Sequence, residues 1–269
     1  MLYLCATPIG NLEDITIRVL NTLKNVDLIL AEDTRHSAVL LNHFEIKKPM
    51  MSFHKFSDQS RLDEVIEKLK NGVEIALISD AGTPCISDPG YELVKACIEN
   101  NIEFTSLPGA TAFTTALTLS GLSTQSFLYY GFLPQKKSAL EEVLGSLKTV
   151  KSTLIFYEAP HRVAKTLIEL EKHLGDRNIA LCRELTKLHE TVLRMKISEA
   201  IAYYDENEPK GEFVLVVEGY EETVEENLDF VAEYNKYIEE GVDRKEALKL
   251  ISKRAGVPKR DVYNIINNI

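Results

Sequence analysis

Residues 74–84 read Glu-Ile-Ala-Leu-Ile-Ser-Asp-Ala-Gly-Thr-Pro, and this stretch decides the fold class. Its first half is a short apolar run that is typical of a buried strand. Its second half is a turn in which glycine lets the backbone approach a neighbour closely and proline stiffens the chain. The same succession of an apolar run and a Gly/Pro turn recurs at residues 2–11 and 104–112. Several strands of one sheet are therefore expected to end in turns of the same kind.

Helical patterns separate these strands. Apolar residues at helical spacing predict one helix over 61–70 and another over 91–99. Asp14 is expected to cap a helix that runs to Leu23, and residues 28–31 form another short apolar run. Alternating strands and helices predict an α/β domain with a largely parallel sheet, which we assign to residues 1–120.

The pattern restarts at residues 127–132, so a second α/β domain is expected over residues 121–222, with the boundary near 118–125. The apolar stretch 213–217 is typical of a strand buried on both faces. The other strands and helices of this domain are expected at 153–157 and 179–182, and at 137–147 and 162–174.

The last part of the chain has a helical pattern only. Four acids in residues 221–226 indicate a solvated linker. Asp243 and Glu246 fit a capping box, and Gly256 fits a helix end. Three helices with short turns predict a small domain over residues 228–269 that resembles a helix-turn-helix.

The composition limits the class of protein. The chain has 269 residues, of which 45% are apolar and 27% charged, as in globular proteins with a real core. No apolar stretch reaches the roughly 18 residues that span a bilayer, and no basic region precedes the first apolar run, so neither a membrane segment nor a signal peptide is expected. The four cysteines lack C-x-x-C spacing, so we expect no metal site and reduced thiols in a cytoplasm.

The net charge of −10 opposes non-specific binding to nucleic acid, so any contact with RNA needs a local basic patch. The clearest patch surrounds the last turn of the chain, where four basic residues gather: Lys253, Arg254, Lys259 and Arg260. Such a patch is typical either of a helix-turn-helix that binds nucleic acid or of a solvated helix end.

The Gly/Pro turns at 7–11, 79–84 and 107–112 are candidates for a ligand cleft, because open α/β sheets bind ligands at the carboxyl ends of their strands. A single such turn can simply mark a chain reversal, but three of them favour a cleft. None has the G-x-G-x-x-G or G-x-x-x-x-G-K-[ST] pattern, so a Rossmann dinucleotide site and a P-loop are disfavoured. The chain also lacks H-E-x-x-H and G-x-S-x-G.

The order of short motifs resembles the ribosomal RNA small-subunit methyltransferase I family, which belongs to the tetrapyrrole-methylase superfamily. The resemblance extends over nearly the whole chain. The motifs are Ala-Thr-Pro-Ile-Gly-Asn-Leu (6–12), Ala-Glu-Asp-Thr-Arg (31–35), Ser-Asp-Ala-Gly-Thr-Pro (79–84), Asp-Pro-Gly (88–90), Leu-Pro-Gly (107–109), Gly-Phe-Leu-Pro (131–134), Phe-Tyr-Glu (156–158), His-Arg (161–162), Arg-Glu-Leu-Thr-Lys (183–187) and Lys-Gly-Glu (210–212).

The resemblance implies two α/β domains with S-adenosylmethionine in the cleft between them. It also implies a homodimer that methylates a cytidine ribose 2′-hydroxyl in the 16S RNA of the small ribosomal subunit. By motif position, the cofactor is expected to contact Pro8, Gly10, Asp80, Thr83, Ala110, Thr111, Ala112, Tyr157, Leu185 and Glu212. The turn itself adds Gly82, where the backbone can meet a ligand.

A ribose hydroxyl is a poor nucleophile, so a nearby base would assist its attack. Asp33, Glu158 and His161 are the candidates for this catalytic role, and Arg35 and Arg162 are candidates for holding phosphates. The sequence departs from the family's usual His-Glu/Asp-His-Asn run, because only His54 matches in residues 54–58.

Two other functions remain open. A methylase of corrin or siroheme precursors would share the cofactor cleft but has no obvious use for a helical tail that binds RNA. A non-catalytic ribosome-assembly factor could keep the fold and lose the cofactor. Binding and transfer experiments with the cofactor distinguish the three.

Overall fold

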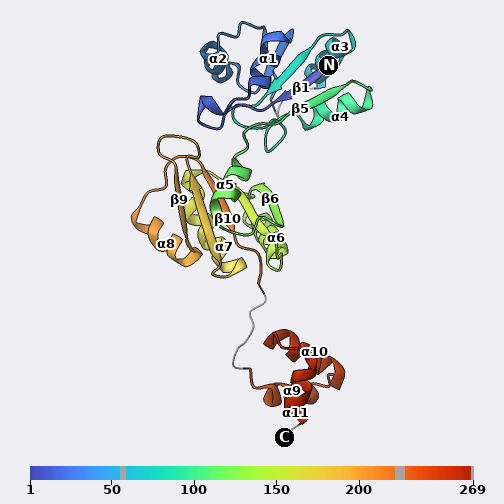
Figure 1. The fold of residues 1–269 in the computed structure, drawn as a ribbon, viewed down its shortest axis with the longest axis vertical. Helices are drawn as coiled ribbons and strands as arrows, with labels where there is room; N and C mark the ends of the chain where they lie inside the picture. Colours follow the sequence, from blue (N-terminus) through green and yellow to red (C-terminus); the bar gives the residue numbers. More distant parts are fainter. Residues whose placement is uncertain (55–58, 222–227, 268–269) are drawn as a thin grey trace. The chain divides into compact units, whose positions relative to one another are not determined.

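The computed structural model describes residues 1–54, 59–221 and 228–267 (Figure 1). The chain divides into two compact units, residues 1–219 and 220–269. Among the described residues, the first unit contains two β-sheets and the second contains helices but no strand. The structure is therefore α/β with a helical C-terminal part, as the sequence predicts. The expected division of the first unit at residues 120/121 stays a prediction, and the departure at residues 55–58 lies outside the described residues.

The first sheet is parallel throughout and has the strand order β3-β2-β4-β1-β5. Its strands are β1 (Leu2–Cys5), β2 (Leu28–Ala31), β3 (Met50–Ser52), β4 (Ile75–Ile78) and β5 (Phe104–Leu107). Every residue of β2 and β4 is buried, as expected for central strands covered on both faces.

Helices cover both faces of this sheet. Hydrophobic side chains of α1 (Ile17–Asn25) and α2 (Thr34–His43) pack on one face. Those of α3 (Gln59–Lys70) and α4 (Tyr91–Glu99) pack on the other. The expected cap of α1 was wrong: Thr16 Oγ1 accepts the N–H of Val19 at 3.1 Å, and Asp14 belongs to a short 3₁₀ helix, η1 (Leu12–Asp14).

The second sheet is mixed and has the order β6-β7-β10-β8-β9. Only β6 and β7 pair in parallel. Its strands are β6 (Phe127–Phe132), β7 (Thr153–Glu158), β8 (Asn178–Arg183), β9 (Thr191–Lys196) and β10 (Phe213–Val217). The central strand β10 is buried at every residue, which fits its continuous apolar sequence.

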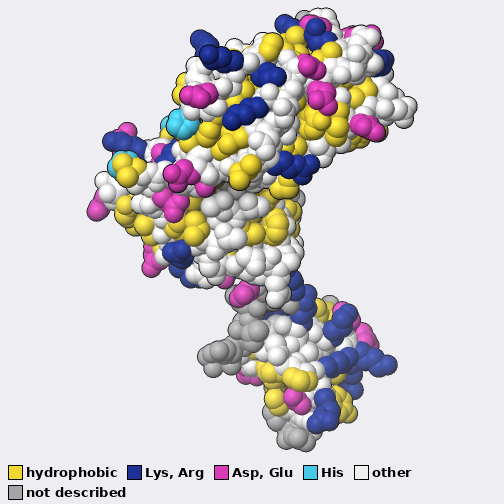
Figure 2. All heavy atoms as spheres, turned by 45° about the horizontal axis from the view of Figure 1, so that its top comes forward, with side chains coloured by type: hydrophobic (Ala, Val, Ile, Leu, Met, Phe, Trp, Pro, Cys, Tyr) yellow, Lys and Arg dark blue, Asp and Glu magenta, His cyan; other side chains and the backbone are white. Residues whose placement is uncertain are grey.

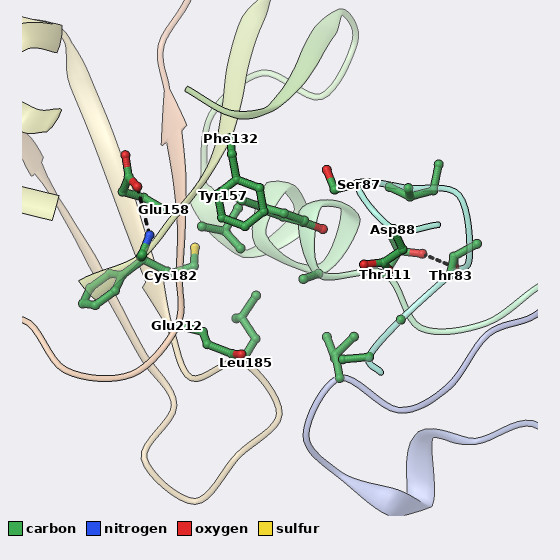
Figure 3. A pocket seen from close by; sticks show the side chains of 18 of the residues that line it. Thr83, Ser87, Asp88, Thr111, Phe132, Tyr157, Glu158, Cys182, Leu185 and Glu212 are labelled. Atoms are coloured by element: carbon green, nitrogen blue, oxygen red, sulfur yellow. Dashed lines mark hydrogen bonds between the residues drawn. The ribbon is translucent and has the colours of Figure 1, made fainter. Parts of the chain in front are cut away.

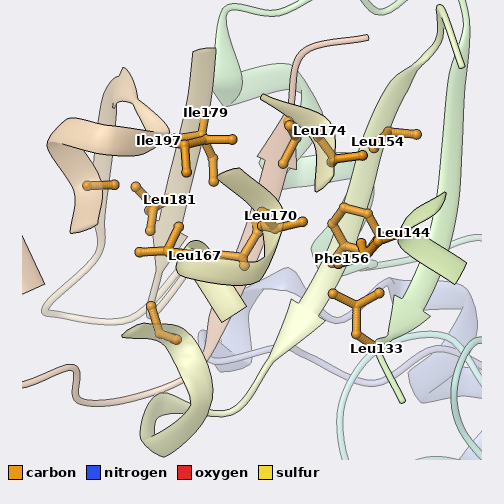
Figure 4. Packing of buried hydrophobic residues seen from close by; sticks show 14 of the residues in the cluster. Leu133, Leu144, Leu154, Phe156, Leu167, Leu170, Leu174, Ile179, Leu181 and Ile197 are labelled. Atoms are coloured by element: carbon orange, nitrogen blue, oxygen red, sulfur yellow. The ribbon is translucent and has the colours of Figure 1, made fainter. Parts of the chain in front are cut away.

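Helices also cover both faces of the second sheet. One face carries α6 (Lys137–Leu147), α7 (Val163–Leu174) and α8 (Ile197–Glu206) over a leucine-rich core (Figure 4). The other face carries α5 (Ala112–Ser120), whose Ala116 and Leu117 pack with Val214 and Val216 of β10. The first sheet thus leads directly into a helix that belongs to the packing of the second.

The helical unit contains α9 (Phe230–Glu239), α10 (Arg244–Ala255) and α11 (Lys259–Asn267), around a core that includes Ile251 and Val262. Asp243 caps α10 by accepting the N–H of Lys245 at 2.9 Å. Among the described residues, no helix is both long and apolar enough to cross a membrane.

Candidate functional site

A cavity of about 430 Å³ lies between loops of the two sheets of the first unit (Figure 3). Small-molecule sites typically enclose about 300–1,000 Å³, so this cavity has the size of a ligand site. The loop that follows β4 and the start of α5 form one wall, and the ends of β7, β8 and β10 form the other. It is lined by Ile9, Ala81, Gly82, Thr83, Ile86, Ser87, Asp88, Thr111, Ala112, Phe132, Tyr157, Glu158, Ala159, Pro160, Cys182, Leu185, Glu212, Phe213 and Val214.

The first wall is built on a tight turn at Gly82. Backbone hydrogen bonds join Thr7 and Gly82 in both directions, at 2.8 and 3.1 Å. Gly82 has φ +85°, and a Cβ there would lie 3.3 Å from Ile9 Cγ2. Thr83 Oγ1 donates to the carbonyl of Ala110 at 3.0 Å and lies 2.7 Å from Thr111 Oγ1. These bonds hold two loops of the first sheet together beside the cavity.

The second wall is aromatic and joins α5 to β7. The Tyr157 hydroxyl accepts the N–H of Phe113 at 3.1 Å. The Tyr157 ring packs edge-on against Tyr129 and Phe132. Burial raises the pKa of the Tyr157 phenol above its ordinary value, so the ring presents a neutral hydroxyl.

A loop of the second sheet closes against a loop of the first. Thr186 Oγ1 accepts the N–H of Asn11 at 3.0 Å. A Cβ on Gly10 would lie 2.5 Å from Lys187 Cγ, so only glycine permits this approach. The Lys187 ammonium donates to Glu184 at 3.0 Å and to Glu212 at 2.7 Å, which fixes this loop beside the cavity.

Seven of the eleven residues expected to meet the cofactor line the cavity: Gly82, Thr83, Thr111, Ala112, Tyr157, Leu185 and Glu212. The other four are not among its lining residues. Pro8 is buried, Gly10 meets the Lys187 loop, Asp80 accepts the N–H of Asp33 at 3.2 Å, and the carbonyl of Ala110 accepts from Thr83. Their direct contact with a cofactor stays a prediction.

Only one of the three candidate bases lines the cavity. Glu158 does so, but its fully buried carboxylate is held on both oxygens by Ala159, Arg162 and Thr166. Asp33 caps α2 and pairs with Arg35 at 3.1 Å, and these interactions hold its pKa below the ordinary value. His161 is exposed on the short helix η2 (Pro160–Arg162), beside a separate groove.

Asp88 lines the cavity from the loop after β4 and was not among the site residues predicted from the sequence. Burial raises its pKa to about 7, and the nearby charges of Glu32 and Asp80 act in the same direction. A hydrogen bond from Ser79 partly opposes this shift. The Asp-Pro-Gly motif was a signal, because it follows a strand in the same loop as Gly82.

The candidate phosphate-binding residues differ in their surroundings. The Arg162 side chain is 19% exposed, bonds to the carbonyl of Leu133 at 2.9 Å and pairs with Glu158. The Arg35 side chain is 91% exposed, although it pairs with Asp33. The burial of the Arg162 side chain and its bonds within the protein favour a structural role for this residue.

In the helical unit, Lys253, Lys259 and Arg260 are exposed, whereas Arg254 is half-buried and pairs with Glu233. Figure 2 shows Lys and Arg side chains gathered on one face of this unit. In the described part of the chain, no group of three or more His, Cys, Asp or Glu side chains could hold a metal ion.

The chain is similar to known methyltransferases. The family of tetrapyrrole (corrin/porphyrin) methylases matches residues 1–201. The protein named ribosomal RNA small subunit methyltransferase I from Halalkalibacterium halodurans is 48% identical over 98% of this chain and 93% of its own. The protein of the same name from Thermotoga maritima is 46% identical over 82% of this chain and 99% of its own.

Solved structures share the fold. The uroporphyrin-III-C-methyltransferase from Thermus thermophilus has a TM-score of 0.58 at 19% identity, over 80% of this chain and 93% of its own. A cobalt precorrin-4 methyltransferase has a TM-score of 0.61 at 16% identity, over 80% of this chain and 93% of its own.

Proposed function

This chain belongs to the ribosomal RNA small subunit methyltransferase I family of the tetrapyrrole methylases, and we propose that it methylates the 2′-hydroxyl of a cytidine ribose in the 16S RNA of the small ribosomal subunit. It is a methyltransferase that uses S-adenosylmethionine. The observation that carries the proposal is the cavity between the two sheets, placed where turns of one wall meet aromatic and apolar side chains of the other.

The residues at the cavity fit this cofactor. Apolar side chains such as Ile9, Leu185 and Val214 can cover an adenosyl group. The backbone at Gly82 and the hydroxyls of Thr83 and Thr111 provide polar contacts on the facing wall. When bound, S-adenosylmethionine supplies an electrophilic methyl group on its sulfonium, so the transfer needs no metal.

The contribution of the protein to this reaction is mainly positioning. Holding the attacking hydroxyl in line with the methyl group converts a bimolecular step into an effectively unimolecular one. A base beside the hydroxyl adds to the rate. The rigid turn at Gly82 and the loop held by Lys187 keep the two walls in fixed positions for this task.

We also propose that the helical unit binds RNA phosphates. Residues 228–269 carry eight basic and seven acidic side chains, whereas the whole chain carries −10. Phosphate contacts dominate the affinity of proteins for nucleic acid, so a unit free of the general negative charge suits this role. We assign the phosphate contacts to four basic side chains of this unit: Lys253, Arg254, Lys259 and Arg260. Arg35 is a further candidate in the first unit.

We further propose that the protein acts as a homodimer in the cytoplasm. The edge strand β6 exposes three aromatic side chains, Phe127, Tyr130 and Phe132, which are 44%, 39% and 54% exposed. Exposed aromatic side chains on an edge strand offer a second copy of the chain a surface on which to pack.

The test is to supply labelled S-adenosylmethionine with assembled small subunits, naked 16S RNA or a tetrapyrrole precursor. We expect label in RNA only, and nucleoside mass spectrometry should find 2′-O-methylcytidine. The Gly82→Val variant serves as the control with an impaired cofactor cavity. Label in the tetrapyrrole would establish the alternative methylase. Absence of transfer to any acceptor, together with absence of cofactor binding in calorimetry, would establish a non-catalytic assembly factor.

A further inference from the structure

A second cavity, of about 600 Å³, lies against the proposed cofactor cavity. Ser87 and Asp88 line both cavities and so form a shared wall. Glu32 and His54, which follow β2 and β3, also line the second cavity, as does the first turn of α4. It thus occupies the carboxyl edge of the first sheet, where open α/β sheets bind ligands.

The lining of this second cavity suits a neutral ring system better than a phosphate. Tyr91 is 68% exposed at the start of α4, which leaves its ring available for stacking. The side chains of Glu32, Asp88 and Glu92 are acidic, and none of the described residues that line the cavity is lysine or arginine. These carboxyl groups disfavour an anionic ligand beside them and offer hydrogen-bond acceptors to hydroxyl and amino groups.

We propose that this second cavity, called here the acceptor cavity, receives the target nucleoside extruded from the RNA strand, and that Asp88 in the shared wall accepts the proton of its ribose hydroxyl. The inference rests on the proposed function and extends it to the residues that hold the acceptor. Enzymes that modify one nucleotide commonly take it out of the stack into a pocket and hold the base against aromatic side chains. A carboxylate such as Glu92 can accept a hydrogen bond from the exocyclic amine of cytosine.

With Asp88 as the base, the atoms and charges of the methyl transfer balance. The ribose oxygen forms a bond to the methyl carbon while the bond from that carbon to sulfur breaks. The hydroxyl proton passes to the Asp88 carboxylate, and the sulfur keeps the electron pair of the broken bond and becomes a neutral thioether. The positive charge of the sulfonium and the negative charge of the carboxylate are both lost, and Asp88 later returns its proton to solvent.

The loop that carries Asp88 is held firmly. Ser87 Oγ lies 2.6 Å from the Tyr129 hydroxyl on the second sheet. Gly90 has φ +131°, and a Cβ there would lie 2.7 Å from both Cys85 Sγ and Leu77 Cδ2. Because the loop is fixed at both sides, Asp88 keeps its place in the shared wall without reorganisation during the reaction.

The surroundings of Asp88 match a base that works near neutral pH. Its pKa is raised to about 7 by burial first and then by Glu32, with Asp80 adding to the rise and Ser79 opposing it. Other titratable groups facing this region are Cys85, Tyr129 and Tyr157, with His54 beside Glu32 and Glu92 in the same cavity. Above its pKa the Asp88 carboxylate is ionised and can accept a proton, and below it the group is protonated and cannot.

The first test compares Asp88→Asn with the wild type and with Asp205→Asn, which changes an exposed aspartate on α8. The measurements are cofactor affinity by calorimetry and single-turnover methyl transfer to unmodified small subunits across pH. We expect the wild-type rate to rise about tenfold per pH unit until pH is about 7 and then level off. Asp88→Asn should keep the cofactor affinity, lose roughly 100-fold or more in rate and lose this inflection.

The second test uses the exposed side chain of Tyr91, whose removal does not endanger folding. Binding of unmodified small subunits is measured in the presence of S-adenosylhomocysteine, so that no turnover occurs. Tyr91→Ala should bind roughly tenfold more weakly, as expected for the loss of one base stack, and Tyr91→Phe should bind like the wild type.

The outcomes separate the two proposals. If the wild type methylates RNA but Asp88→Asn keeps its rate and its inflection, or Tyr91→Ala keeps its affinity, the acceptor cavity is wrongly assigned and the proposed function stands. If the wild type transfers no methyl group to RNA, the proposed function fails and this inference fails with it.

Discussion

The buried carboxylate of Glu158 offers a sharp test of whether that residue supports the fold or the chemistry. Its side chain is fully buried, and one oxygen accepts a hydrogen bond from Thr166 Oγ1 at 2.6 Å. The other oxygen accepts the N–H of Ala159 at 2.9 Å and pairs with Arg162 Nε at 3.3 Å. The perturbation is Thr166→Val, which removes one hydroxyl and nearly preserves the volume.

The magnitude follows from the type of bond. A hydrogen bond to a charged group contributes about 1.5–3 kcal/mol, and its loss leaves a buried carboxylate oxygen without a partner. Since Thr166 is 5% exposed, water does not replace the hydroxyl. We expect the free energy of unfolding of the first unit to fall by about 2 kcal/mol. For a unit of this size, that corresponds to a decrease in Tm of roughly 4–8 °C.

The assay is calorimetric unfolding of the full chain, with Thr118→Val as the matched control. Thr118 is exposed, and its hydroxyl donates to the carbonyl of Thr115 within α5. The control should lose less than about 0.5 kcal/mol. Because Thr166 lies outside the cavity lining, cofactor affinity and methyl transfer at a temperature well below Tm should stay near wild type. Unchanged stability together with a slow transfer step would refute this reasoning and return Glu158 to the chemistry.

Three further outcomes are expected. Gly82→Val should weaken binding of S-adenosylmethionine in calorimetry, because a branched side chain at φ +85° strains the turn and meets Ile9; unchanged affinity in the folded variant would contradict this. Exhaustive chelation of the enzyme should leave methyl transfer intact when the magnesium needed by the RNA is supplied separately, and recovery only with a protein-bound metal would oppose it. Replacing the four basic residues of the helical unit by alanine should make the salt dependence of RNA binding shallower, by roughly one unit of slope per lost contact, without changing cofactor affinity. A changed dimer dissociation with an unchanged slope would instead assign them to the subunit interface; the residues are Lys253, Arg254, Lys259 and Arg260.

The sequence was sufficient for the regular α/β elements because their strands are continuous apolar runs and their helices have clear spacing. It was insufficient where tertiary packing decides. Strand β9 (Thr191–Lys196) was missed because it is a partly exposed edge strand with charged residues such as Arg194. The packing of α5 on the second sheet also depends on which face meets β10, and no local pattern states this.

The candidate site was predictable in part, because some of its features are local patterns in the sequence. Gly/Pro turns after strands can be seen directly in the sequence, and these turns lead to the cavity. The acidic surroundings of Asp88 could not be seen, because Glu32 and Asp80 come from different strands. They meet because β2 and β4 are neighbours in the sheet, although β3 separates them in the sequence. The shift of a pKa by burial is likewise a property of the folded chain.

The distribution of charge explains how an acidic protein can act on RNA. Phosphate binding needs cations, but the acceptor cavity is lined by carboxylates that would repel the backbone of the strand. The two requirements are compatible if the phosphates stay outside that cavity and only the neutral sugar and base enter it. The basic face of the helical unit can then supply affinity for phosphates, whereas the carboxylates of the acceptor cavity supply proton transfer and base recognition. On this view the acidity of the first unit is part of its selectivity, because it admits one extruded nucleoside and rejects the rest of the strand.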